Sequence, residues 1–383
     1  MMEYRLEELF DLQMGKTPSR SNPEYWDTKD NKWISIADLS KCGKYICETK
    51  EYISDAAVEE SGISRIPVNT VVMSFKLSIG KTAITSEEMY SNEAIMSFRD
   101  KGMADLLPEY VYYLLLAHDW SEGTNKAVMG KTLNKATLSK IKVKVHTREE
   151  QIEIVDCLNR AYNVISTRQQ QLQKLDELVK ARFVEMFGEP KENSKGYSKR
   201  QLKETCKVIT GNTPSRSVNE YYGKHIEWIK TDNIVSNRIN PTVATEFLSE
   251  EGLAVSRTVE KGSILMACIA GSVSSIGRVC ITDRKVAFNQ QINAIVPNNY
   301  NVLFLYVMLQ ISKEYLIEGI NMALKGILSK SKLEEKTFIV PPMEVQEKFA
   351  AFVKQVNKSK NAIQKALDES QLLFDSLMQK YFG

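Results

Sequence analysis

Two long segments of the chain carry apolar residues at the spacing of packed helices. Residues 148–187 and 344–382 contain neither Gly nor Pro and are rich in charged side chains. A seven-residue apolar repeat, which is typical of a coiled-coil seam, runs through the first segment at Leu158, Ile165, Leu172, Val179 and Met186. We therefore expect a long helix of about 35 residues in each segment, about 50 Å in length at about 1.5 Å per residue.

The second long segment keeps the repeat less strictly. Its equivalent positions are Val353, Lys360, Leu367, Phe374 and Tyr381, with Val356, Ile363, Ser370 and Leu377 beside them. Because Lys360 and Ser370 interrupt the apolar seam, a regular coiled coil is less strongly indicated there. The simplest burial packs the two helices against each other, antiparallel, through Leu158, Ile165, Leu172, Val179, Val353, Ile363, Leu367 and Phe374.

Shorter elements are predicted before each long helix. β-like runs such as 70–75 and 262–267 are separated by Gly, Pro, Asn and Ser. One helix-like stretch interrupts each set, at 108–117 and at 302–311. Pro341-Pro342 signals the start of the second long helix, whereas the first is preceded by Val145-His146-Thr147 and its start is less clearly marked.

The sequence contains an internal duplication. The segment GKTPSRS at 15–21 returns as GNTPSRS at 211–217, with six of seven positions identical. The match continues in order, with offsets held between 195 and 197 residues. It includes Trp-Ile at 33–34 and 228–229, Ser-Ile-Gly at 78–80 and 275–277, Asn92 and Asn289, Gln151 and Gln346, and Phe-Gly at 187–188 and 382–383. Such collinear matches indicate two copies of one structural unit.

These patterns predict an α+β protein with two tandem, pseudo-symmetric recognition domains separated by two long, antiparallel, paired helices that act as a coiled-coil spacer. The expected segments are a first recognition domain at 1–145, a central helix at 146–188, a linker at 189–197, a second recognition domain at 198–341 and a C-terminal helix at 342–383.

Composition excludes some classes of protein but does not indicate a particular ligand. The net charge is +3, with 43% hydrophobic and 26% charged residues, so a uniformly basic DNA-packaging protein is disfavoured. No signal region or membrane-spanning run occurs. The six cysteines contain no Cys-x-x-Cys pair, and there are three histidines. Free thiols in a reducing cytoplasm therefore fit better than zinc sites or disulfides, and we expect no metal site.

The order of these features resembles the specificity subunit of type I restriction–modification systems. The resemblance rests on the Gly-x-Thr-Pro-Ser loop, the Trp-Ile-x-x-x-Asp/Asn segment, Ser-Ile-Gly, the Pro-Pro-x-x-x-Gln start of a long helix and its Phe-Gly end. All of these except Pro-Pro occur in both copies. The resemblance covers essentially the whole chain. The first copy departs from the pattern because it lacks Pro-Pro.

The resemblance implies that each recognition domain reads one half of a bipartite, asymmetric site in double-stranded DNA, while the helices set the spacing. It also implies assembly with two modification subunits, which carry S-adenosylmethionine and methylate adenine, and with two motor-nuclease subunits that use ATP and Mg. This chain would hold no cofactor, have no catalytic site of its own and contact no membrane. Consistent with this, it shows no Asn/Asp-Pro-Pro-aromatic tetrapeptide and no Gly-x-x-x-x-Gly-Lys-Ser/Thr loop.

Candidate DNA contacts lie in the repeated loops, each with a structural alternative. Hydroxyls, cations and backbone amides beside Gly suit phosphate contacts, but the Gly-x-Thr-Pro-Ser-Arg-Ser loops also suit a tight turn. The same two alternatives, a phosphate contact or a structural turn with a solvated cation, apply to the Ser-Ile-Gly turns and their following cation. They also apply to the basic loops near 131 and 325. Trp33 and Trp228 are predicted to be core. The candidates are Lys16, Thr17, Ser19, Arg20, Lys76, Ser78, Lys81, Lys131, Lys135, Asn212, Thr213, Ser215, Arg216, Ser272, Ser274, Arg278, Lys325 and Lys330.

Motifs that are unchanged between the two copies cannot discriminate bases, so the specificity residues are expected where the copies differ. The alternative function is a non-catalytic adaptor, in which a coiled coil holds two protein-binding domains apart.

Overall fold

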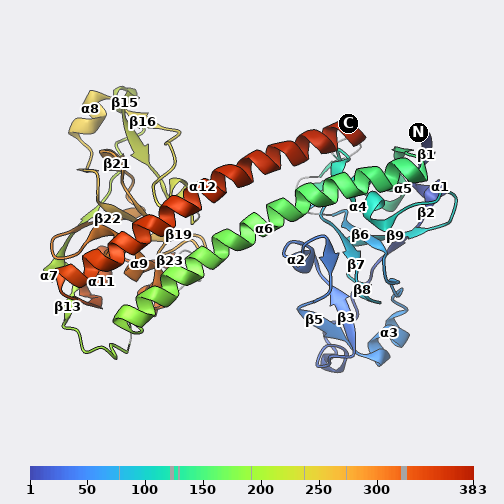
Figure 1. The fold of residues 1–383 in the computed structure, drawn as a ribbon, viewed down its shortest axis with the longest axis horizontal. Coiled ribbons are helices and arrows are strands. Elements are labelled where there is room, and N and C mark those ends of the chain that lie inside the picture. The colour runs from blue at the N-terminus through green and yellow to red at the C-terminus, as the bar shows by residue number, and fades with distance from the viewer. Residues whose placement is uncertain are drawn as a thin grey trace. The chain divides into compact units, whose positions relative to one another are not determined.

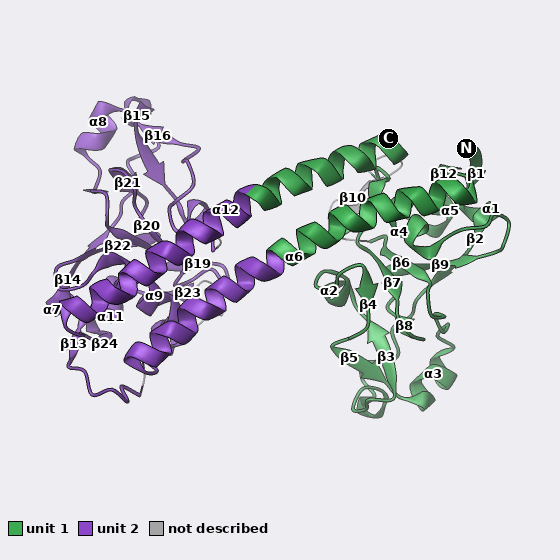
Figure 2. Ribbon diagram, in the orientation of Figure 1, with its two compact units in different colours: residues 1–168, 366–383 green, residues 169–365 purple. Residues whose placement is uncertain are grey.

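The structure is a computed structural model that describes residues 1–76, 78–120, 125–127, 130–190, 192–236, 238–272, 274–320 and 326–383, with backbone only for 125–127 and 130–132. Contacts divide the chain into a first unit, residues 1–168 with 366–383, and a second unit, residues 169–365 (Figure 2). Each unit therefore contains part of both long helices.

The described part of the first unit contains two larger sheets and two pairs of strands, β1 with β12 and β10 with β11. A five-stranded sheet has the order β2-β9-β6-β7-β4, and a three-stranded sheet has the order β5-β3-β8 (Figure 1). The strands are β1 (Met2–Arg5), β2 (Phe10–Met14), β3 (Asn31–Ile34), β4 (Tyr45–Ile46), β5 (Glu51–Ile53), β6 (Val71–Ser74), β7 (Thr82–Thr85), β8 (Tyr90–Ser91), β9 (Ile95–Asp100), β10 (Asn125–Ala127), β11 (Gly130–Thr132) and β12 (Lys142–Val145). The short helices are α1 (Leu6–Leu9), α2 (Ile36–Leu39), α3 (Asp55–Ser61), α4 (Pro108–Ala117) and α5 (Lys135–Ser139).

The second unit repeats this plan with sheets ordered β14-β22-β18-β20 and β16-β15-β21-β17. Its strands are β13 (Lys199–Gln201), β14 (Cys206–Thr210), β15 (Tyr222–Ile229), β16 (Phe247–Leu248), β17 (Thr258–Val259), β18 (Ile264–Ala267), β19 (Ile269–Ala270), β20 (Val279–Ile281), β21 (Val286–Phe288), β22 (Ile292–Pro297), β23 (Gly326–Ile327) and β24 (Thr337–Ile339). Its helices are α7 (Leu202–Thr205), α8 (Glu250–Ala254), α9 (Val302–Ile311), α10 (Lys313–Ile317) and α11 (Lys330–Glu335).

The strand pairings confirm the duplication. β3 lies parallel to β8 with Trp33 opposite Tyr90, and β15 lies parallel to β21 with Trp228 opposite Ala287. β1 pairs with β12, and β13 pairs with β24, both antiparallel. The predicted helices at 108–117 and 302–311 form as α4 and α9, since both are apolar enough to bury most of their side chains.

The two long helices form where the apolar repeat predicts them, as α6 (Arg148–Phe187) and α12 (Met343–Phe382). The start of α6, which has no Pro-Pro signal, is capped by Thr147. The Thr147 amide donates to the Glu150 carboxylate at 2.9 Å, and the Glu150 amide donates back to the Thr147 hydroxyl at 3.4 Å, which is a capping box. In the part of the chain that the structure describes, no helix is both long and apolar enough to cross a membrane.

Within each unit the two long helices lie side by side and antiparallel. In the first unit the Arg168 guanidinium donates to the Ala366 carbonyl and the Ser370 hydroxyl, and further along, Cys157 meets Tyr381. In the second unit Lys360 pairs with Asp176 at 2.5 Å, and Phe183 packs against Phe349 at a centroid distance of 5.5 Å. Both interruptions of the predicted seam, Lys360 and Ser370, thus make polar contacts across the helix pair.

The predicted seam is buried at some positions and half-buried at others. Leu158, Ile165, Val353 and Phe374 are buried. The remaining predicted contact residues, Leu172, Val179, Ile363 and Leu367, are half-buried. A helix pair that combines apolar positions with polar contacts across it departs from a uniform a/d seam of apolar residues.

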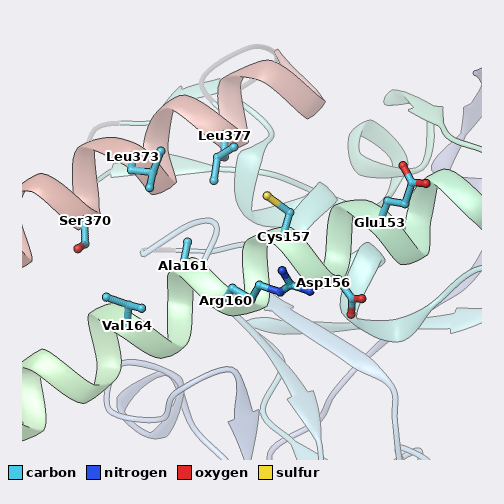
Figure 3. Close-up of a pocket in the computed structure, with 9 residues that line it drawn as sticks. All are labelled: Glu153, Asp156, Cys157, Arg160, Ala161, Val164, Ser370, Leu373 and Leu377. Atoms are coloured by element: carbon cyan, nitrogen blue, oxygen red, sulfur yellow. The ribbon is translucent and has the colours of Figure 1, made fainter.

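The helix pair of the first unit carries an open apolar groove of about 500 Å³ (Figure 3). Figure 3 shows Leu373 and Leu377 of α12 facing Cys157 and Ala161 of α6 across it. Leu373 is 57% exposed and Val164 43% exposed, so the groove presents large apolar side chains to solvent. The charged rim is formed by Glu153, Asp156 and Arg160.

Candidate nucleic-acid interface

The Gly-x-Thr-Pro-Ser-Arg-Ser loops begin at glycines that pack directly on backbone. Gly15 donates its amide to the Ile95 carbonyl at 3.1 Å, and Gly211 donates to the Ile292 carbonyl at 3.0 Å. A Cβ added at Gly15 would lie 2.2 Å from the Ser91 carbonyl oxygen, and one at Gly211 would lie 2.2 Å from the Asn289 carbonyl oxygen. Neither position has room for a side chain, which explains why both copies keep glycine.

Each loop is held from below by a buried tryptophan. The Trp33 indole N–H donates to the Lys16 carbonyl at 3.1 Å, and the Trp228 indole N–H donates to the Asn212 carbonyl at 3.2 Å. The two side chains are 2% and 3% exposed. The prediction that these tryptophans belong to the core is confirmed, and their polar atoms fix the loop path.

The arginine of each loop has the same two partners in both copies. Arg20 donates to both oxygens of Glu51 and lies 3.6 Å from the Trp26 ring centroid. Arg216 donates to Glu246 at 2.6 Å and lies 4.5 Å from the Tyr222 ring centroid. The hydrogen bond from Arg20 lowers the pKa of Glu51. Both guanidinium groups are therefore engaged within the protein, which supports the structural interpretation of this arginine, although each remains exposed.

The other loop candidates divide into exposed and engaged side chains. Lys16, Ser19 and Ser215 are exposed. Thr17 donates to the Glu93 carboxylate, whereas the equivalent Thr213 donates to the Gln290 amide oxygen. This replacement of a carboxylate by an amide accompanies the replacement of Lys16 by Asn212, so the second copy lacks both of these charges. The Asn212 amide donates to the Val255 carbonyl at 2.9 Å.

The Ser-Ile-Gly segments form tight turns, the first between β6 and β7 and the second between β19 and β20. Gly80 and Gly277 have φ of 88° and 75°, a backbone conformation that favours glycine. The cation after each glycine has a local partner. Lys81 donates to the Ser40 hydroxyl, and the Arg278 Nε donates to the Ser275 carbonyl at 3.3 Å. Ser78 accepts from Ser74 through its carbonyl oxygen, and Lys76 lies 5.2 Å from the Phe75 ring centroid.

The remaining candidates lie on the basic loops. Lys135 and Lys330 begin α5 and α11 and are both exposed, and Lys330 pairs with Glu334 at 3.5 Å. Ser272 and Ser274 are exposed on the loop before β20. The Lys131 side chain and the whole of Lys325 lie outside the described residues. For every one of these positions, a role in DNA contact stays a prediction.

A pair of glutamines, matched in the duplication, attaches each recognition fold to its long helix. Gln151 of α6 accepts from the Leu107 amide at 3.0 Å and donates to the Asp105 and His146 carbonyls, each at 3.1 Å. Gln346 of α12 accepts from the Asn301 amide at 2.9 Å and donates to the Asn299 and Pro341 carbonyls. Both side chains are buried, at 1% and 0% exposure. The sequence showed that Gln151 and Gln346 are equivalent, but only the structure shows the backbone hydrogen bonds that they make.

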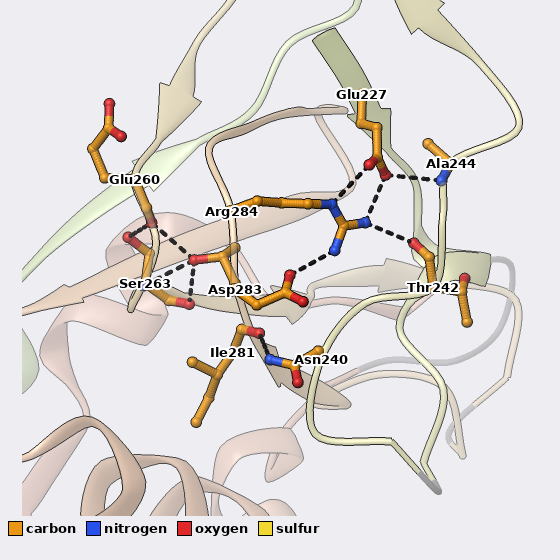
Figure 4. A network of polar contacts seen from close by, with 10 residues as sticks. Glu227, Asn240, Thr242, Ala244, Glu260, Ser263, Ile281, Asp283 and Arg284 are labelled. Carbon is orange, nitrogen blue, oxygen red and sulfur yellow. Dashed lines mark hydrogen bonds and ion pairs between the residues drawn. The ribbon is translucent and has the colours of Figure 1, made fainter.

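One ion pair occurs at equivalent positions of the two copies, with the positive and negative residues exchanged. In the first unit Lys32 donates to Glu87 at 2.6 Å. At the equivalent positions of the second unit, Arg284 donates to both oxygens of Glu227, at 2.7 and 2.6 Å (Figure 4). The hydrogen bond from Arg284 lowers the pKa of Glu227. The two copies thus differ by compensating changes, which keep the ion pair and exchange the positions of its positive and negative members.

Comparison with known proteins identifies the family. A family model described as the type I restriction modification DNA specificity domain matches residues 1–177 and again 194–370.

The chain belongs to the type I restriction–modification specificity family.

One relative in this family matches along nearly the whole chain, and another matches over part of it. The chain is 24% identical over 400 residues to the type I restriction enzyme MjaIX specificity subunit of Methanocaldococcus jannaschii, covering 98% of this chain and 91% of that protein. It is 32% identical over 119 residues to the HindI specificity subunit of Haemophilus influenzae, covering 30% of this chain and 25% of that protein.

Solved structures support the fold. The S subunit of a type I system from M. genitalium aligns with a TM-score of 0.56 at 15% identity, over 100% of this chain and 96% of that one. A second structure, described as the basis of complex assembly and conformational transition of a type I R-M system, aligns with a TM-score of 0.53 at 16% identity, over 99% and 96%. At these identities the likeness shows the fold: two tandem specificity domains of mixed helix and sheet.

Two features of the candidate interface were not found from the sequence. The reversed ion pair could have been found by aligning the two copies around Trp33 and Trp228, since both partners keep their spacing. Lys313, which the structure places beside Arg278 and Ser274, carries no sequence signal because it falls outside every repeated motif.

Proposed function

We propose that this chain is the DNA-reading subunit of a type I restriction–modification enzyme, with each recognition domain reading one half of a bipartite, asymmetric site in double-stranded DNA. The observation that carries the proposal is the two-copy match to a DNA specificity domain, combined with loops that share one frame and differ in charge. Thr17 beside Glu93 and Thr213 beside Gln290 are one such difference.

The long helices are proposed to act as the spacer between the two half-sites. Gln151 and Gln346 each fix a recognition fold to the first turns of a helix through three backbone hydrogen bonds. A rotation or shift of the helix would therefore carry the attached fold with it. Inserting one helical turn into both α6 and α12 should lengthen the unread gap and leave both half-sequences unchanged. Altered half-sequences would contradict the spacer role.

The chain is further proposed to dock two modification subunits that carry S-adenosylmethionine and methylate adenine, and, in the full restriction enzyme, two motor-nuclease subunits that use ATP and Mg. The apolar groove between α6 and α12, with Leu373 and Val164 exposed, supports docking of an apolar segment of a modification subunit on the helix pair. Such a complex would act in the cytoplasm. Catalysis and cofactors would belong to those partners.

Methylome sequencing of a host with and without this chain tests the proposal. The expected result is adenine methylation at one split, asymmetric sequence that disappears with the chain. Replacing residues 1–145 by another recognition domain should change one half-site alone.

The alternative is an adaptor that holds two protein-binding domains apart and does not touch DNA. It predicts tight binding of partner proteins with no sequence-selective footprint and no change in the methylome, so the same experiment separates the two functions.

A further inference from the structure

Two cations of the second unit are tied to one serine-rich loop, which connects β19 to β20. The Lys313 ammonium donates to the Ser274 carbonyl at 2.6 Å. The Arg278 Nε donates to the Ser275 carbonyl at 3.3 Å. Arg278 closes the Ser-Ile-Gly turn, and Lys313 begins α10, so two separate elements bring these charges together.

The loop presents hydroxyl groups beside the cations. Ser272 Oγ lies 3.0 Å from Ser274 Oγ and 2.9 Å from Ser275 Oγ. Ser272 and Ser274 are exposed. Hydroxyls and cations together are the usual donors to a phosphate oxygen.

The positive charge of this cluster is not neutralised within the described residues. There, neither Lys313 nor Arg278 has a carboxylate within ion-pair distance, in contrast to Arg216 with Glu246 and Arg284 with Glu227. Burial lowers the pKa of Lys313, and the nearby charge of Arg278 lowers it further. An ammonium has three donors and a guanidinium five. The loop carbonyls accept from one donor of Lys313 and one donor of Arg278, so several donors of both side chains remain for a ligand.

The equivalent turn of the first unit is covered differently. A Cβ added at Gly277 would lie 3.5 Å from Lys313 Cγ, so the lysine stem covers that turn. A Cβ added at Gly80 would lie 3.0 Å from Trp120 Cδ1. The Trp120 side chain is buried, and its N–H donates to the Leu115 carbonyl at 3.0 Å. An apolar ring thus occupies the place that a cation takes in the second unit.

We propose that Arg278, Lys313 and the hydroxyls of Ser272 and Ser274 form a binding site for a phosphate of the DNA backbone, and that the first unit's Gly80 turn, covered by Trp120, does not form one. The inference rests on the proposed DNA-reading function. It assigns Lys313 as a positioning contact, because a phosphate fixes the protein on the duplex without reporting base identity. The second half-site is therefore held by an anchor that the first half-site lacks.

The test measures how DNA affinity depends on salt for the full-length chain bound to its modification partner. The probe is a fluorescein-labelled duplex of random sequence, followed by anisotropy at increasing NaCl. Each phosphate contact contributes a slope of about −0.9 to log K against log salt. Lys313→Gln keeps a hydrogen-bond donor and loses the charge, so it should make the slope shallower by about 1. Adding Arg278→Gln should change the slope little further, because both cations are proposed to contact one phosphate, so the total change stays at about 1.

Two control variants separate charge from structure. Lys313→Arg keeps the charge and should retain the wild-type slope. Lys261→Gln changes an exposed lysine at the opposite end of β18 and should also leave the slope unchanged. If Lys313→Gln matches Lys261→Gln while the wild type binds DNA with a steep slope, the phosphate site is wrong and the DNA-reading function stands. If the wild type shows no salt-dependent DNA binding, both are wrong.

Discussion

Aromatic side chains join the recognition fold to the long helices in both units, through phenylalanines in the second unit and through contacts such as Tyr110 with Phe382 in the first. The first unit adds a buried lysine to this junction. Lys44, 8% exposed, donates to Glu109 of α4 at 2.9 Å and also to Asn159 of α6. Tyr113 donates to the same Asn159 oxygen at 2.8 Å. In the second unit Phe304 of α9 packs on Phe187 of α6 at a centroid distance of 4.8 Å, and Phe349 of α12 packs on both Phe183 and Phe187.

The comparison shows that the same fold tolerates a junction that contains a buried ion pair and a junction that is aromatic without one. An aromatic cluster gains its stability from buried area and tolerates small shifts, because apolar burial is not directional. A buried ion pair is directional, and leaving one partner alone is costly. The glutamines Gln151 and Gln346 make the same backbone hydrogen bonds in both units. They therefore set the attachment, and the surrounding side chains are free to diverge.

The largest expected effect comes from the aromatic junction. Phe349→Ala removes a fully buried ring that contacts Phe183, Phe187 and Phe304. A loss of about 3–5 kcal/mol is expected for such a truncation. Hydrogen exchange should show it as faster exchange in second-unit peptides, with first-unit peptides unchanged. Leu372→Ala, at a side chain that is 71% exposed, is the control and should change stability by less than about 0.5 kcal/mol.

The Lys44–Glu109 ion pair should contribute less stability than the aromatic junction. Removing one of its two members should cost more than replacing both. Lys44→Ala leaves Glu109 without its cation and should cost about 2 kcal/mol, below the 3–5 kcal/mol of a fully buried pair, since the Glu109 side chain is 30% exposed. Urea unfolding followed by exchange in first-unit peptides measures it. Replacing both partners, as Lys44→Met with Glu109→Leu, should recover much of the loss. A double variant less stable than Lys44→Ala would contradict this view of the junction.

The reversed ion pair offers a smaller and more specific test. Glu227→Lys places two cations together where Arg284 now makes two hydrogen bonds to a carboxylate, and it should cost about 1.5 kcal/mol. Adding Arg284→Glu recreates the charge order of Lys32 and Glu87 and should restore about half of the loss. Thermal unfolding of the single and double variants gives the coupling, and the absence of any recovery would show that the two positions are not equivalent.

Acid should weaken the junction that contains the Lys44–Glu109 ion pair before the aromatic one. Burial alone would raise the pKa of Glu109, but the hydrogen bond and charge of Lys44, with hydrogen bonds from Tyr45 and Asn159, outweigh it, and the pKa lies below its ordinary value. This stabilisation is therefore complete above the unfolded pKa of about 4.3 and is lost as the pH falls through the lower folded pKa. Melting temperatures between neutral and acid pH should fall less steeply for Glu109→Gln than for the wild type.

Much of the fold could be predicted because its signals are local. The spans of α4, α9 and α6 follow from apolar spacing and from breakers at their ends. The duplication follows from collinear motifs. The start of α6 could also have been found from Thr147 and Glu150, which form the capping box that replaces Pro-Pro.

The candidate site was harder, because the same residue type serves two purposes. Arg20 and Lys313 are both cations on loops, but one donates to a carboxylate and the other has none within ion-pair distance in the described part of its surroundings. A sequence cannot tell these apart, since the partners lie 31 and 39 residues away in the chain.

The sequence by itself determined that this protein is two copies of one α+β unit with two long helices, because periodicity and repetition are properties of the chain. Only the tertiary structure decided which conserved residues are structural. Gly15, Trp33 and Gln151 are kept because backbone approaches them closely or accepts their hydrogen bonds. It also decided which cations of the described residues have a carboxylate partner, since that depends on which distant residues fold against each cation.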